Sequence, residues 1–179
     1  MPTTGAAPYP LATPPTEPNT KTTPTIHIEL TPHILSASSA TAFVRSPCAG
    51  ATVLFIGTTR DTFGNRRVAS LSYTAYTPLA LSTLYTIGAT VLEKHACTKI
   101  AIVHRLGECG VGEESIVIAV SAPHRAEAWR AGEEALEEVK RKAEIWKLER
   151  FEGGEGVWRA NRDGGVGVRV EGEGEGKGQ

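Results

Sequence analysis

The sequence lacks an excess of charge of either sign and has no long apolar run. Its 179 residues include 19 Lys and Arg against 20 Asp and Glu, a formal net charge of −1. This balance gives no electrostatic footprint for duplex nucleic acid, whose binding usually needs a basic face. No apolar run approaches the roughly 20 residues that cross a bilayer. Residues 1–21 contain neither the apolar core of a signal peptide nor the arginines of a transit peptide. These absences predict a protein of the cytosol that binds neither nucleic acid nor membranes.

Cysteine is also scarce. Cys48, Cys97 and Cys109 are odd in number and show no C-x-x-C spacing, which argues against both a disulfide framework and a zinc clip. The sequence has no G-x-S-x-G or H-E-x-x-H motif and no acidic cluster suited to Mg²⁺ or Ca²⁺. No metal site is therefore expected.

The two ends of the chain differ in composition from its middle. Residues 1–24 hold seven of the eleven prolines, interleaved with threonine, and such a segment cannot bury enough apolar surface to offset its ordering entropy. Residues 163–179 are rich in Gly and Glu, which also cannot pack. We therefore expect a disordered arm over 1–24, one globular domain over 25–162 and a disordered tail over 163–179.

Within the domain, hydrophobic periodicity predicts the elements. Residues 51–56 form a continuous apolar run typical of a central strand, and residues 25–30 alternate like an edge strand. After Pro78, and again after Pro123, apolar residues recur at helical spacing, and the stripe of the second of these helices is expected to include Trp129. The remaining expected elements are a short helix over 36–45 and strands over 68–76, 100–103, 116–120, 146–151 and 157–161. The pattern is α+β, a mixed sheet with two principal helices on it.

A His-Arg pair stands at the expected start of the second long helix. Backbone N–H groups and the dipole at a helix N-terminus favour an anion. Arg125 adds a bidentate donor suited to phosphate, and His124 can exchange a proton near neutral pH. The alternative is a solvated first turn, and on the pair alone that alternative is favoured.

Two lysines follow at the other end of the same helix. Lys140 lies one position past Val139, on the flank of the apolar stripe, and Lys147 is seven residues further on, beyond Trp146. Two neighbouring amines, partly desolvated by the tryptophan, would suit proton transfer or nucleophilic attack. Lysines that only cover apolar surface explain the spacing equally well. Arg60 follows the apolar run at 51–56, at the end of a strand, where sheets present side chains to ligands. The alternative interpretation is that Arg60 is an ordinary loop arginine.

Several motifs occur together, in order, between residues 25 and 162. They are Gly50-Ala51 through Phe55-Ile56-Gly57-Thr58-Thr59-Arg60-Asp61, Val103-His104-Arg105-Leu106-Gly107, Val111-Gly112-Glu113, Ser121 to Arg125, Lys140, Ile145-Trp146-Lys147-Leu148-Glu149 and Trp158. This set resembles the catalytic (large) subunit family of molybdopterin synthase.

The resemblance implies an α/β-hammerhead type domain that dimerises and binds a small ubiquitin-like sulfur-carrier subunit at each end, as a heterotetramer. It also implies the reaction, in which two sulfurs pass from the carrier's C-terminal Gly-Gly thiocarboxylate to cyclic pyranopterin monophosphate. No metal or diffusible cofactor is expected. The catalytic residues it implies are Lys140 and Lys147. The substrate-binding residues it implies are Thr58, Thr59, Arg60, His124, Arg125, Leu148, Glu149 and Arg162.

Two questions remain open at the level of sequence. Glu144 stands where the family usually has proline, and it is a potential partner for either lysine. The rival function is a non-catalytic dimeric module that binds a ubiquitin-like tail or a phosphometabolite without turning it over. Only the enzyme requires both lysines.

Overall fold

The structure is a computed structural model that describes residues 15–160 and 167–170. Within these residues the chain forms three helices, α1 (Ala37–Val44), α2 (Thr77–Lys94) and α3 (Arg125–Lys142). The strands are β1 (Asn19–Thr22), β2 (Ile26–Thr31), β3 (Ala51–Thr58), β4 (Thr62–Phe63), β5 (Arg66–Ala75), β6 (Lys99–Arg105), β7 (Gly107–Gly110), β8 (Glu114–Ala122), β9 (Ile145–Phe151), β10 (Gly156–Ala160) and β11 (Val168–Val170). No helix of this described part is long and apolar enough to cross a membrane.

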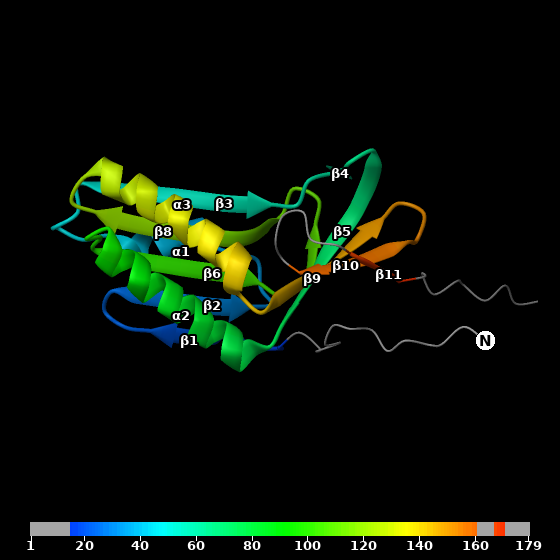
Figure 1. Cartoon of the computed structure of the whole chain (residues 1–179), viewed down its shortest axis with the longest axis horizontal. Helices are drawn as coiled ribbons and strands as arrows, with labels where there is room; N and C mark the ends of the chain where they lie inside the picture. Colours follow the sequence, from blue (N-terminus) through cyan, green and yellow to red (C-terminus); the bar gives the residue numbers. More distant parts are fainter. Residues whose placement is uncertain (1–14, 161–166, 171–179) are drawn as a thin grey trace, which may run out of the picture.

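The first sheet is mixed, and helices cover both of its faces. Its strand order is β1-β2-β6-β8-β3, with β2 and β6 parallel and the other neighbours antiparallel. Ile100 and Ile118 face α2 and α3, whereas Ala101 and Ala119, one position along each strand, pack with α1 on the other face. Figure 1 shows α2 and α3 lying across this sheet. The expected α+β class, with two long helices on a mixed sheet, is confirmed.

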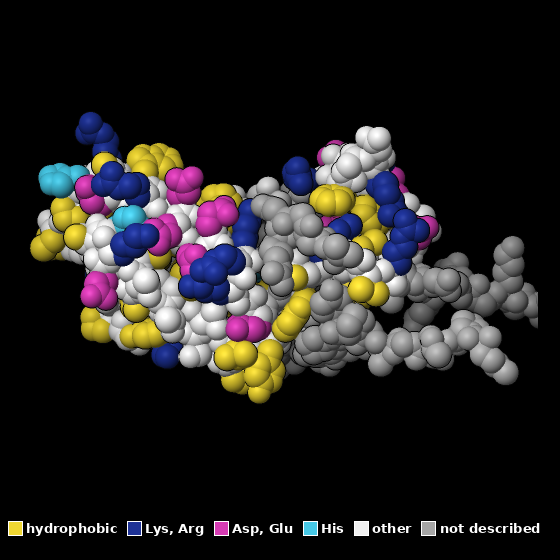
Figure 2. Space-filling model, in the orientation of Figure 1, with side chains coloured by type: hydrophobic (Ala, Val, Ile, Leu, Met, Phe, Trp, Pro, Cys, Tyr) yellow, Lys and Arg dark blue, Asp and Glu magenta, His cyan; other side chains and the backbone are white. Residues whose placement is uncertain are grey.

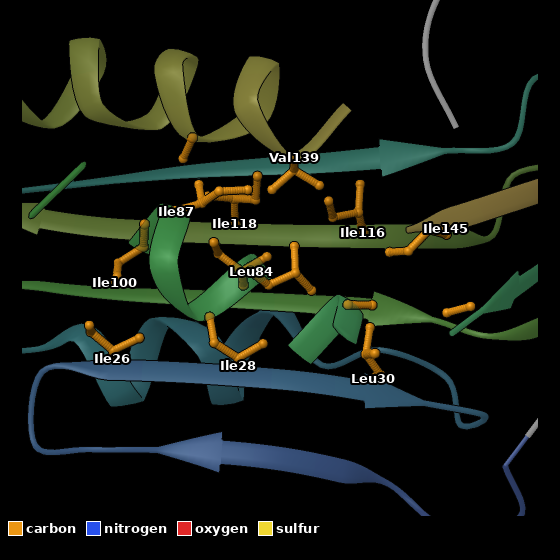
Figure 3. Packing of buried hydrophobic residues seen from close by; sticks show 14 of the residues in the cluster. Ile26, Ile28, Leu30, Leu84, Ile87, Ile100, Ile116, Ile118, Val139 and Ile145 are labelled. Carbon is orange, nitrogen blue, oxygen red and sulfur yellow. The ribbon is translucent and has the colours of Figure 1, made fainter. Parts of the chain in front are cut away.

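The core lies between the first sheet and the two long helices. Figure 3 shows side chains of β2 and β6 pointing toward α2, and Val139 of α3 lying over β8. Each residue labelled in Figure 3 is at most 8% exposed, and fully burying such a side chain contributes roughly 1.5–3 kcal/mol to stability. The residues labelled there are Ile26, Ile28, Leu30, Leu84, Ile87, Ile100, Ile116, Ile118, Val139 and Ile145.

Small residues let the long helices approach the sheet closely. A Cβ on Gly132 would lie 3.3 Å from Val53 Cγ1, so α3 rests almost directly on β3. The buried face of α3 consists of Ala128, Ala131, Gly132, Ala135 and Val139. The expectation that Trp129 belongs to this face is wrong, because Trp129 is 65% exposed. Close packing selects the alanines, whereas periodicity alone favours the larger apolar side chain.

The second sheet stands at one end of the first. Its order is β11-β10-β9-β5-β4, and β7 also pairs with β5. Figure 1 shows the second sheet beyond the C-terminal ends of β3 and α3. The chain enters this sheet directly from those two elements, at β4 and at β9. The place where the two sheets meet is therefore bounded by the end of a strand, the last turn of a helix and a sheet face.

Strand pairing differs from expectation at the sheet edges. The apolar strand β3 lies at the edge of the first sheet and not at its centre. Conversely, β2 is not an edge strand, because β1 pairs with it from Asn19 to Thr22. That strand lies inside the range expected to be an unstructured arm, and Val168–Val170 pairs with β10 inside the expected tail. Backbone hydrogen bonds pair these short segments with neighbouring strands, and composition does not report on backbone pairing.

Candidate functional site

A cavity of about 440 Å³ lies where the two sheets meet. Arg60, Lys140 and Lys147 all line it, so the structure brings together three of the cationic residues singled out from the sequence. Figure 2 shows dark blue Lys and Arg side chains interspersed with magenta acidic ones, both over α2 and α3 and on the second sheet. Among the residues that the structure describes, the charged ones that line the cavity are three cations and one carboxylate, Glu149.

Lys140 owes its place to the end of α3. Its neighbour Val139 is buried against the sheet, so Lys140 emerges at the flank of the packed face, as the sequence predicts. The helix closes at Ala143, whose N–H donates to the Val139 carbonyl at 3.0 Å. Lys140, Arg141 and Lys142 all stand in the last turn, where the helix dipole favours cations.

Lys147 reaches the same cavity from strand β9. Ile145, Lys147 and Glu149 alternate onto one face of the strand, and Ile145 anchors that face in the core. Lys147 pairs across the sheet with Tyr73 of β5, which also lines the cavity. The chain therefore leaves the helix before Lys147, and a helix end and a strand deliver the two lysines separately.

Glu149 is a buried carboxylate held by two cations. Its side chain is 2% exposed. Lys147 Nζ lies 3.2 Å from Glu149 Oε1, and Arg159 Nε donates to Glu149 Oε2 at 2.9 Å. Glu149 lines the cavity, so an anionic ligand there meets a carboxylate that is already paired.

Neutral polar groups, which the sequence analysis did not select, also line the cavity. Burial lowers the pKa of His104 to about 4, and its Nδ1 donates to the Arg105 carbonyl at 2.7 Å. Burial raises the pKa of Tyr73 to about 12, with an opposing hydrogen bond from Ser115. Both rings are uncharged at neutral pH and meet edge to face with centroids 5.0 Å apart. In the sequence, the alternation of Leu71, Tyr73 and Ala75 was the one signal that could have placed Tyr73 on the inner face of its strand.

Of the other predicted site residues, some line the cavity and others do not. Thr58 lines the cavity. Thr59 is 3% exposed and turns its hydroxyl to Cys109, donating to Sγ at 3.3 Å. Leu148 is buried on the opposite face of β9 from Lys147. Substrate binding by Thr59 and Leu148 stays a prediction that their side-chain positions do not support. Arg162 lies outside the described residues.

His124 and Arg125 stand at the far end of α3 from the cavity. His124 caps the helix in an extended conformation and Arg125 is its first residue. Lys140 is fifteen positions after Arg125, which is about 22 Å along an α-helix. Within one chain these two residues do not join the cavity of Arg60, Lys140 and Lys147.

Glu144 does not line the cavity between the lysines. Its Oε1 accepts a hydrogen bond from Thr83 Oγ1 of α2 at 3.1 Å, and its backbone carbonyl accepts from the Tyr76 N–H at 3.2 Å. It thereby ties the α3–β9 connection to the start of α2. Among the described residues, no group of three or more His, Cys, Asp or Glu is arranged to hold a metal ion.

Known proteins resemble the chain in both sequence and structure. Residues 30–142 match the MoaE protein family. The molybdopterin synthase catalytic subunit of Phaeosphaeria nodorum is 76% identical over 87% of this chain and 83% of its own length, and that of Pyrenophora tritici-repentis is 72% identical over 87% of each. The crystal structure of molybdopterin synthase from Staphylococcus aureus superposes with a TM-score of 0.70 at 35% identity, over 73% of this chain and 94% of that one. The chain belongs to the MoaE protein family.

Proposed function

We propose that this protein is the catalytic subunit of a molybdopterin synthase, a sulfurtransferase of molybdenum cofactor biosynthesis. In the proposed reaction, two sulfurs pass from the C-terminal Gly-Gly thiocarboxylate of a small ubiquitin-like carrier to cyclic pyranopterin monophosphate. The names of its relatives support the enzyme class. The carrier, the substrate and a cytosolic setting are parts of the proposal that rest on the resemblance and on the sequence.

The observation that carries the proposal is the convergence of Arg60, Lys140 and Lys147 on one cavity. A thiocarboxylate and a cyclic phosphate are both anions, and they repel each other as they approach. A preorganised group of cations in a partly enclosed site offsets that repulsion and raises the local concentration of both reactants. A chain with a net charge of −1 achieves this only by concentrating its cations locally.

The positions of the two lysines favour different roles. Lys140 extends from a helix end, and we assign to it the steering of the thiocarboxylate and the acid–base or nucleophilic step. Lys147 is 18% exposed and already paired with Glu149, so we assign to it the support of Lys140 and the contact with the pterin. Glu149 contributes by holding Lys147, and Arg60 and Thr58 bind the substrate from the end of β3.

His124 and Arg125 fit the same reaction if a second copy of the chain supplies them. Strand β3 is a sheet edge that exposes Leu54 by 39% and Ile56 by 37%, and an uncharged edge strand of this kind is suited to pairing with another strand.

The ends of β3 decide what such pairing brings together. The N-terminal end of β3 touches the start of α3, since a Cβ on Gly50 would lie 2.5 Å from the Pro123 carbonyl oxygen. The C-terminal end leads to Arg60 at the cavity. Antiparallel pairing of β3 with β3 of a second copy would therefore set the second copy's His124 and Arg125 beside the first copy's cavity. We propose this homodimer, with a carrier at each end, as the working assembly.

The proposal is tested by mixing the full-length protein with a thiocarboxylated carrier and cyclic pyranopterin monophosphate and measuring molybdopterin. Turnover that requires Lys140 and Lys147 supports the enzyme. The non-catalytic alternative predicts that the protein binds the carrier or the phosphate but forms no product.

A further inference from the structure

The ion pairs of Glu149 involve its two oxygens separately. Oε1 faces Lys147 Nζ at 3.2 Å, and Oε2 accepts from Arg159 Nε at 2.9 Å. Glu149 as a whole is 1% exposed. Arg159 belongs to β10 and is not among the residues that line the cavity, whereas Lys147 and Glu149 are. The arginine therefore acts on the carboxylate from behind the cavity wall.

The strand register explains why a carboxylate between two cations is needed here. Lys147 and Arg159 are direct cross-strand partners in the β9–β10 pair, and like charges opposite each other are destabilising. Glu149, two residues along the same face as Lys147, bridges them. A buried carboxylate must itself be paired, and with Arg159 absent its remaining ion pair in the described part of the chain would be the one with Lys147. The lysine would then be held more tightly to Glu149 and be less available to a ligand.

Arg159 is in turn held on its other side. Its guanidinium carbon lies 5.1 Å from the ring centroid of Phe63, within the range of a cation–π contact. Phe63 belongs to β4 and lines the cavity. One arginine thus connects the β4 rim of the cavity to the carboxylate that orients Lys147.

We propose that Arg159 is a positioning residue, which directs the Lys147 amine into the cavity by holding the second oxygen of Glu149. The proposal rests on the proposed function for its effect on turnover, but its effect on Lys147 is independent of any substrate. Arg159 is not among the site residues selected from the sequence.

The test compares Arg159→Met with wild type in the full-length protein. The reactivity of Lys147 toward an amine-acylating reagent, followed by peptide mass spectrometry, is expected to fall by about threefold, the scale of a single modest ion pair. In the sulfur-transfer assay, kcat is expected to fall by about tenfold because Lys147, which supports the reacting Lys140, is misplaced. KM for the pterin should rise by about threefold, in step with the loss of Lys147 reactivity, because Lys147 is assigned the contact with the pterin. Arg159→Lys restores the charge and should recover most of both losses.

Arg66→Met is the matched control. Arg66 also pairs with a glutamate, Glu155 at 2.6 Å, and stacks on an aromatic ring, Phe151 at 3.7 Å, but it does not line the cavity or contact Glu149. It should change neither Lys147 reactivity nor kcat. Unchanged Lys147 reactivity in Arg159→Met would overturn the proposal, as would an equal loss in Arg66→Met. If the wild type makes no molybdopterin while Lys147 reactivity falls as expected, the proposed function fails and the positioning role stands.

Discussion

The buried imidazole of His104 makes folding stability depend on pH in a window that can be calculated. Burial lowers the His104 pKa from 6.5 to about 4, so the unfolded chain binds a proton at a higher pH than the folded chain does. Stability linked to this group is therefore complete above pH 6.5 and is lost as pH falls toward 4. Between pH 7 and pH 5 the expected loss is about 2 kcal/mol.

The assay is urea unfolding at pH 7 and pH 5, at one protein concentration because association also affects stability. His104→Gln keeps an N–H donor but does not titrate, and its unfolding free energy should fall by about 2 kcal/mol less than that of wild type over the same interval. Carboxylates such as Glu134 and Glu138, whose pKa values are lowered by hydrogen bonds from basic neighbours, titrate equally in both proteins and cancel. Equal losses in wild type and His104→Gln would refute the account of His104 as a buried neutral group beside the cavity.

Three further predictions concern the core, the α3 start and the cavity. Leu84→Ala, at a fully buried core position, should lower the unfolding free energy by about 3 kcal/mol in urea titrations. Leu79→Ala, at a residue 47% exposed, should change it by less than about 0.5 kcal/mol. Equal effects of the two substitutions would contradict the packing described. Gly50→Ala should destabilise by about 2 kcal/mol in calorimetry, because its Cβ would lie 2.5 Å from a backbone oxygen, and an unchanged Tm would show that the contact is not tight. Arg60→Ala should raise KM for the cyclic phosphate about tenfold at low salt and less at high salt, and a salt-independent KM would argue against an anion contact.

Much of the fold follows from the sequence where a pattern and its physical cause coincide. Both long helices, the flank position of Lys140 and the strand at 146–151 were predictable, because burial on one side imposes periods of 3.6 and 2 on the residues. A run such as 51–56 looks the same at the centre and at the edge of a sheet, since its apolar residues can face a second copy as well as a core. The pairing of Asn19–Thr22 uses backbone groups that carry no side-chain signal.

The candidate site was likewise predictable from the sequence only in part. The cations were predictable because charged side chains beside apolar stripes stand out, and Arg60, Lys140 and Lys147 do share a cavity. Tyr73 and His104 were not selected, because on a strand they look like core residues until their neighbours are known. The separation of Arg125 from Lys140 could have been obtained from the sequence alone, since the rise per residue fixes the length of any helix that contains both.

The measurement that tests the central claim most directly is the rate of molybdopterin formation by Lys140→Ala, given a thiocarboxylated carrier and cyclic pyranopterin monophosphate. Lys142→Ala is its control, because Lys142 stands in the same helix turn, is 47% exposed and pairs with Glu138. The sulfur-transfer account predicts a loss of at least about 100-fold for Lys140→Ala and a change within about twofold for Lys142→Ala. Equal rates for Lys140→Ala and wild type would contradict the assignment of this cavity as the catalytic centre.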